Sequence, residues 1–180
     1  MEKESYTVVE VDRDDMARMN QCAMLLIEYF LHVAHWNVDD INPNDWTRLS
    51  MILNNFKDGQ HKLFLAYSSE ADEPSKPVGV CGVNRQGCAQ HLYIQPDFRG
   101  KGLAKALVSK QFDNGAWFTT VLNSNTASLS LMRKLGLIEV GTYEDLILFM
   151  RKQELHELDE NAQESIQEIT SSLEIESNHK

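Results

Sequence analysis

Apolar residues recur at intervals of three and four along four segments of the chain, and this spacing places them on one face of a helix. The sequence therefore predicts four helices in the body of the chain, over residues 16–30, 43–58, 103–112 and 126–135. The first two follow one another without an intervening strand. Their expected buried positions are Met16, Met19, Ala23, Leu26 or Ile27, Phe30, Trp46, Leu49, Ile52, Leu53 and Phe56.

Side chains with hydrogen-bonding oxygens precede these helices and are expected to cap them. Asp12 or Asp14 is the candidate for the first helix, and Asn42 precedes Pro43 at the second. Asn125 or Thr126 is the candidate for the fourth helix. Glycine is common just past the end of a helix, so Gly59 and Gly136 are expected to end the second and fourth helices.

Short runs rich in β-branched and aromatic residues lie between the helical segments and predict seven strands. The strands are expected at residues 6–11, 62–67, 78–83, 88–95, 117–122, 138–140 and 146–150. Residues 85–87 are short enough to join the third and fourth strands as a hairpin. The predicted order is β-αα-βββ-α-β-α-ββ. This order indicates an α/β (α+β) fold with a mixed, mostly antiparallel sheet flanked by helices.

The last thirty residues differ in composition from the rest, so we predict a domain over residues 1–150 and an acidic tail over 151–180. The tail carries a net charge of -5, half of the -10 of the whole chain. A narrow apolar stripe runs along residues 155–173. Docking on the domain, association with a partner or a second copy, and disorder are the alternatives for this segment.

Charge and cysteine content exclude several classes of protein. Neither part of the chain carries a basic surface of the kind that binds nucleic acid, and the acidic balance favours a cationic molecule or a lysine-bearing protein as partner. Cys22, Cys81 and Cys88 lack the spacing of a metal site and are expected to be free thiols. No apolar run is long enough to predict a signal peptide or a membrane span, so we expect a cytoplasmic protein.

The most informative stretch is 93–104, which predicts a strand that ends near Pro96, a glycine loop and a helix. Free amide groups at such a helix N-terminus bind phosphate. Two common phosphate loops are excluded by their residues. A Walker loop requires a glycine where the chain has Gln95, and a dinucleotide fingerprint requires one where it has Lys105.

The sequence Arg-x-x-Gly-x-Ala over residues 99–104 instead resembles motif A of the GNAT superfamily of acyl-CoA-dependent N-acyltransferases. Residues 125–137 are similar to a second segment of that family, Asn-…-Leu-Tyr-x-Lys-Leu-Gly-Phe. The predicted order of elements is also the family's order. The resemblance covers about residues 6–150 and implies an N-acetyltransferase that uses acetyl-CoA as co-substrate and needs no metal.

The resemblance also implies which residues bind acetyl-CoA. Backbone groups of Leu92, Tyr93 and Ile94 would pair with the pantetheine arm as an added strand would, and the family usually has a bulge in this strand. Amides along the glycine loop would hold the pyrophosphate, and Asn125 would contact the cofactor through its side chain. The loop residues are Arg99, Gly100, Lys101, Gly102, Leu103 and Ala104.

The sequence departs from the family at the positions that carry acid–base chemistry. Met132 stands where many members have a proton-donating tyrosine, and Gln90 and Thr120 stand where others have a glutamate. His91 is the candidate base, because its ordinary pKa lies near neutrality. Tyr143 is the candidate acid.

Residues 32–40, which resemble the acceptor-binding bend of the family, are aromatic and acidic. Glu28 on the first predicted helix is a candidate to face the substrate, with an exposed salt bridge as the alternative. A His-x-x-His pair in this bend lacks a third metal ligand nearby in the sequence, so no metal site is predicted.

The sequence favours direct transfer of acetyl from acetyl-CoA to a primary amine, which is a small molecule, a protein N-terminus or a lysine. The alternatives are a non-catalytic acyl-CoA-binding regulatory protein and an interaction protein that works through its acidic tail.

Overall fold

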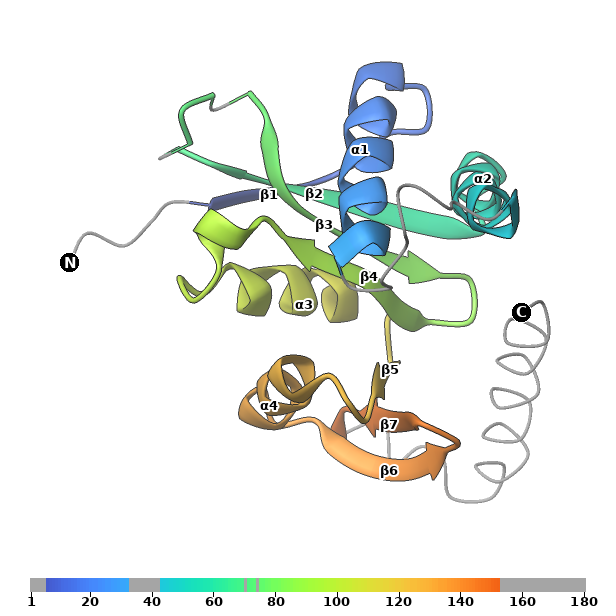
Figure 1. Ribbon diagram of the computed structural model, residues 1–180, viewed down its shortest axis with the longest axis vertical. Coiled ribbons are helices and arrows are strands. Elements are labelled where there is room, and N and C mark those ends of the chain that lie inside the picture. The colour runs from blue at the N-terminus through green and yellow to red at the C-terminus, as the bar shows by residue number, and fades with distance from the viewer. Residues whose placement is uncertain (1–5, 33–42, 70, 74, 153–180) are drawn as a thin grey trace. The chain divides into compact units, whose positions relative to one another are not determined.

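The computed structural model describes residues 6–32, 43–69, 71–73 and 75–152. Its order of helices and strands confirms the predicted order and the α/β class (Figure 1). The elements are β1 (Tyr6–Glu10), α1 (Met16–His32), α2 (Pro43–Lys57), β2 (His61–Ser68), β3 (Pro77–Asn84), β4 (Cys88–Ile94), a short 3-10 helix η2 (Pro96–Phe98), α3 (Leu103–Asp113), β5 (Phe118–Leu122), α4 (Thr126–Lys134), β6 (Ile138–Tyr143) and β7 (Leu146–Met150). They form two compact units, Met1–Ala116 and Trp117–Lys180.

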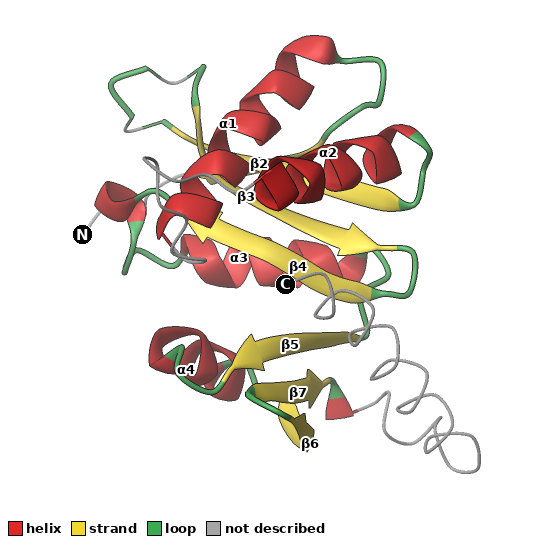
Figure 2. Ribbon diagram, turned by 45° about the vertical axis from the view of Figure 1, so that its right-hand side comes forward, coloured by secondary structure: helices red, strands yellow, loops and turns green. Residues whose placement is uncertain are grey.

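The first unit is built on a four-stranded antiparallel sheet in the order β1-β2-β3-β4. Each strand pairs with the strand that follows it in the sequence. The predicted hairpin at residues 85–87 is confirmed, and the amide of Gly87 donates to the carbonyl of Asn84 at 3.0 Å. Helices cover both faces of this sheet (Figure 2).

Alternation of side chains along the strands divides the core of the first unit between the two faces. Leu63, Leu65, Val80 and Tyr93 pack with apolar residues of α1 and α2. On the other face, Lys110 of α3 lies over the ring of Phe64, and the Cys81 thiol lies 3.7 Å from the carbonyl of Leu107. The sheet is therefore buried on both sides, which explains why β3 is an almost unbroken apolar run.

The second unit contains a three-stranded antiparallel sheet in which β7 pairs with both β5 and β6. The helix α4 carries Leu129 and Met132 on its buried side. The last hairpin is tighter than predicted, because β6 continues to Tyr143 and leaves Glu144 and Asp145 as the turn. Tyr143 is thus a strand residue, not a loop residue.

The structure corrects several predicted helix positions. Asp15 caps α1, since its carboxylate accepts the amide of Arg18 at 3.0 Å, whereas Asp12 accepts only the amide of Asp14. Met16 and Trp46 are exposed to 55% and 48%, so each predicted stripe extends too far toward the start of its helix. Asn42 and the apolar stripe of the tail lie outside the described residues.

Replacing Asp15 with alanine should lower the free energy of unfolding by about 1 kcal/mol, because an amide of the first turn loses its acceptor. Denaturant unfolding measures this change. Asp14→Ala is the matched control, since no α1 amide is bonded to the Asp14 side chain among the described contacts. Equal losses for the two variants would contradict the assignment of Asp15 as the cap.

Candidate functional site

One extra residue distinguishes β4, the last strand of the first sheet. Val80 pairs with Tyr93, but Gly82 pairs with Gln90, so Cys81 alone stands opposite two residues. Those residues are His91 and Leu92. His91 has a φ of 58°, a left-handed conformation that histidine tolerates better than most side chains but less well than glycine. The strand therefore contains a β-bulge, as the family resemblance implied.

The bulge is fixed from the α3 side by a buried glutamine. Nε2 of Gln111 donates to the carbonyl of Gly82 at 2.6 Å and to that of Gln90 at 2.9 Å. These two carbonyls belong to the pair of residues next to the bulge. Gln111 is only 2% exposed, so removing its amide would leave both carbonyls buried with one partner fewer.

Beyond the bulge, the backbone groups of β4 point in alternating directions. The backbone amide of Gln95 donates to the carbonyl of Val78 at 2.9 Å. The backbone groups of Gln95 therefore face β3. By alternation, the backbone of Tyr93 is directed toward Val80, and that of Ile94 away from β3. Only alternate residues of the predicted Leu92–Ile94 stretch can therefore offer backbone groups to an added strand.

The predicted glycine loop follows β4, and two of its glycines are left-handed. Gly100 has a φ of 77° and Gly102 a φ of 93°. A Cβ at either glycine would meet no atom within 4 Å, so the space beside this backbone is open. No side chain caps the first turn of α3, where helix geometry leaves the amides of Leu103 and Ala104 without intrahelical acceptors. These features suit a bound phosphate group.

The two cations of the loop are held by their neighbours. Nε of Arg99 donates to the carbonyl of Ile94 at 2.8 Å, and its guanidinium lies 5.7 Å from the centre of the Tyr93 ring. Nζ of Lys101 lies 5.5 Å from the centre of the Phe98 ring. Both contacts keep positive charge close to the loop backbone.

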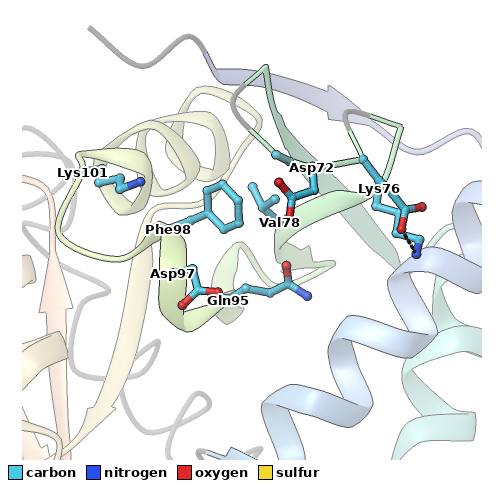
Figure 3. A pocket seen from close by; sticks show the side chains of 9 residues that line it. Asp72, Lys76, Val78, Gln95, Asp97, Phe98 and Lys101 are labelled. Carbon is cyan, nitrogen blue, oxygen red and sulfur yellow. Dashed lines mark hydrogen bonds and ion pairs between the residues drawn. The ribbon is translucent and has the colours of Figure 1, made fainter. Parts of the chain in front are cut away.

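An open pocket of about 380 Å³ lies beside this loop, between it and residues 71–76 (Figure 3). Gln95, Asp97 and Phe98 form its wall on the loop side. Its other lining residues are Ala71, Asp72, Glu73, Lys76, Val78 and Lys101. Acidic and basic side chains are mixed, and Lys76 is bonded to Glu73 at 2.8 Å, so the pocket shows no clear preference for one charge.

Comparison with known protein families finds a match over part of the chain. Residues 59–137 match the family described as an acetyltransferase (GNAT) domain. This central part of the chain is therefore similar to GNAT acetyltransferases. This is the family of acyl-CoA-dependent acetyltransferases that motif A indicated. A search of curated proteins found no match.

Solved structures share the GNAT fold at low sequence identity. A GNAT acetyltransferase from Staphylococcus aureus is 12% identical, with a TM-score of 0.58 over 82% of this chain and 98% of its own. The PaiA N-acetyltransferase from Thermoplasma acidophilum, solved with coenzyme A, is 16% identical, with a TM-score of 0.57 over 82% and 99%. NAA60 from Arabidopsis thaliana, solved with a bisubstrate analogue, is 13% identical, with a TM-score of 0.55 over 79% and 96%.

The candidate base, His91, lies in an apolar, electropositive position. Burial, followed by the neighbouring His61 and Arg48, lowers the pKa of His91 to about 3. Its Nε2 is buried and makes no hydrogen bond. An imidazole with this pKa stays neutral at physiological pH and accepts protons poorly, which favours a positioning role in the bulge over a role as base.

The two remaining sequence candidates, Asn125 and Tyr143, lie in the second unit. Asn125 caps α4, and its side-chain oxygen accepts the amide of Ser128 at 3.1 Å. Tyr143 pairs with Leu146 at the end of β6. Met132, which occupies the position of the family's proton-donating tyrosine, is 5% exposed and packs in the interior.

Two residues of the first unit escaped sequence reasoning. Gln111 lies among apolar residues of α3. A single glutamine there does not indicate a structural role in the sequence, because the carbonyls that it bonds are known only from the structure. Gln95 was considered only as a failed glycine of a Walker loop, although it follows the strand directly. The described residues contain no group of three His, Cys, Asp or Glu side chains arranged to hold a metal ion. None of their helices is long and apolar enough to cross a membrane.

The stability of the protein should fall with acid through His91. The unfolded chain protonates this histidine near the ordinary histidine pKa of 6.5, whereas in the folded protein its pKa is about 3. Between these two pKa values the unfolded state binds more protons than the folded state. The free energy of unfolding therefore falls by about 2 kcal/mol from pH 7 to pH 5. Asparagine tolerates the left-handed backbone, so His91→Asn should remove this part of the pH dependence in urea unfolding. An unchanged dependence would contradict the burial of a neutral imidazole.

Proposed function

We propose that the protein transfers an acetyl group from acetyl-CoA to a primary amine. The observation that carries this proposal is the loop after β4, where two left-handed glycines and an uncapped α3 leave amides facing open space. The matched family and the coenzyme A complex of a structural neighbour support it. Acetyl-CoA would supply the acetyl group as an activated thioester.

The chain's own groups would bind and orient the reactants. Amides from Arg99 to Ala104 would hold the pyrophosphate, and Arg99, Lys101 and Asn125 would add polar contacts. The backbone of Leu92 and Ile94 would align the thioester arm, while Tyr93 uses its own backbone groups within the sheet. Strand amides near the bulge would stabilise the negative charge that develops on the carbonyl oxygen.

In the transfer, the amine nitrogen forms a bond to the acetyl carbon, and the carbon–sulfur bond breaks. A neutral amine nitrogen loses one proton and the sulfur gains one, and an acceptor that arrives as an ammonium ion first gives up a further proton to solvent. His91 and Tyr143 are the candidates for proton transfer from the sequence, although its low pKa makes His91 a weak base. Positioning of the two reactants is therefore the larger contribution that we assign to the protein.

The acceptor class and the setting of the reaction are also part of the proposal. Some structural neighbours were solved with peptide or bisubstrate ligands, which keeps protein N-termini among the acceptors beside lysines and small amines. The three cysteines are buried and none of them forms a disulfide with another, which fits a reducing compartment such as the cytoplasm. We propose residues 155–173 as a segment for self-association or partner binding.

A non-catalytic acyl-CoA-binding protein is the second candidate, because Met132 cannot donate a proton. Release of free coenzyme A in the presence of amines, above the rate without an acceptor, decides between the two candidates. Such release supports the enzyme, and binding without release supports the regulatory protein.

Acetyl-CoA should stabilise the protein. At a hundredfold excess over the dissociation constant, a ligand adds about 2.7 kcal/mol, which raises the melting temperature by about 5–10 °C in a protein of this size. Thermal unfolding with acetyl-CoA measures the shift, and acetate at the same concentration is the control. The absence of any shift at millimolar acetyl-CoA would contradict the proposal.

Gly102→Ala should weaken acetyl-CoA binding about tenfold, because a side chain at a φ of 93° strains the loop and moves its amides. Isothermal titration measures the affinity. Gly115→Ala is a matched control, since Gly115 has a φ of 104° and an equally open Cβ position but follows α3. Both variants should lose stability, and only Gly102→Ala should lose affinity. Equal affinities would contradict the role of the loop.

A further inference from the structure

The carboxylate of Glu28 on α1 lies beside the end of β4. Both oxygens of Glu28 lie 3.4 Å from Nε2 of Gln95, a distance at which a hydrogen bond is weak. Across residues 6–32, 43–69, 71–73 and 75–152, no Lys or Arg side chain forms an ion pair with Glu28. The alternative of an exposed salt bridge is therefore not realised there. The amide of Gln95 extends from the pocket wall toward α1 (Figure 3).

A buried phenol, that of Tyr93, lies near the same carboxylate and near Arg99. Tyr93 is 2% exposed, and its hydroxyl makes no hydrogen bond of normal geometry. Burial and then the nearby Glu28 raise the pKa of Tyr93, while Arg99 lowers it. The phenol consequently stays protonated and neutral at physiological pH. Leaving a buried hydroxyl unpaired is unfavourable, so a ligand that bonded to it would gain affinity.

The remaining neighbours restrict what this ligand can be. The His32 ring stacks on Tyr93, with centres 6.2 Å apart and planes within 7°. The guanidinium of Arg99 lies over the Tyr93 ring and is bonded to the carbonyl of Ile94. This bond holds Arg99 at the end of β4, and among the described residues neither oxygen of Glu28 has a cation partner. Of the groups that could fill this place, a small cation with several N–H donors matches the acceptors best.

We propose that Glu28, Tyr93 and Gln95 form a subsite that binds the acceptor of the reaction as an ammonium ion. The ammonium donates to the two carboxylate oxygens and to the Tyr93 oxygen, while the long Gln95 contact gives way. The subsite selects amines that are charged at neutral pH, such as a peptide N-terminus, a lysine or a polyamine, over neutral arylamines and alcohols. This inference rests on the proposed function, because it assigns the acceptor class of the same site.

The first test uses two probes that carry coenzyme A and differ only in charge. The sulfur of coenzyme A is alkylated with a short flexible chain that ends in an ammonium group, or in a hydroxyl group in the matched probe. Titration calorimetry of the wild-type protein should show about 10- to 100-fold tighter binding of the ammonium probe. Glu28→Gln, which keeps the shape of the side chain, should abolish this preference and leave the affinity for the hydroxyl probe unchanged.

A matched variant separates a local contact from the general field of an acidic protein. Glu10→Gln removes the same charge from an exposed position on β1 and should retain the full preference for the ammonium probe. Tyr93→Phe should reduce the preference in part, and it provides the test if Glu28→Gln does not fold. Equal affinity of the wild type for both probes, or an undiminished preference in Glu28→Gln, would overturn the subsite. Failure of coenzyme A itself to bind would instead overturn the proposed function.

The second test identifies the source of the ammonium group. The acceptors are a lysine-free peptide with a free N-terminus, an N-acetylated peptide with one lysine, and spermidine. For each acceptor that the wild type acetylates, Glu28→Gln should raise KM about 10- to 100-fold and leave KM for acetyl-CoA unchanged. Unchanged KM values for those acceptors would overturn the subsite while leaving the acetyltransferase assignment intact.

Discussion

The extra residue in β4 is the constraint on which the arrangement of the first unit depends. Side chains alternate between the two faces of a strand, so an inserted residue reverses the faces of everything after it. Gln90, which neighbours His61, and Tyr93, which packs with α1 and α2, lie three positions apart on the same face. This is possible only because the bulge lies between them. Without it, Tyr93 would face α3 and could not meet Glu28.

The bulge is held by contacts from both faces of the sheet. On one face, Gln111 bonds two carbonyls of the adjacent residue pair. On the other, the His91 ring packs between Tyr29 and His61 at centre distances of 5.9 and 6.4 Å. A left-handed histidine costs about 1–2 kcal/mol relative to an extended residue. Two bonds from a buried amide and a buried aromatic ring offset a cost of that size.

Local signals predicted the order of elements and the glycine loop, because strand periodicity and the positive φ of Gly100 and Gly102 are encoded within a few residues. Tertiary contacts decided what those signals missed. Asp12, Asp14 and Asp15 are equally good capping residues in sequence, and only the start of α1 selects Asp15. The left-handed residue of the bulge is His91 and not a glycine, so the sequence gave no sign of its backbone conformation. Its low pKa likewise follows from burial and then from His61 and Arg48, which are far away in the sequence.

Two electrostatic effects act on a cationic acceptor, and they differ in range. The net charge of -10 attracts cations to the whole surface, but salt screens such attraction beyond about 8 Å. Long-range attraction changes the rate of encounter and does not distinguish an ammonium at the thioester from one elsewhere on the protein. Discrimination requires a contact that is made at one place only. Glu28 meets this condition because the bulge turns Tyr93 and Gln95 toward it at the end of β4, beside the loop proposed to bind coenzyme A.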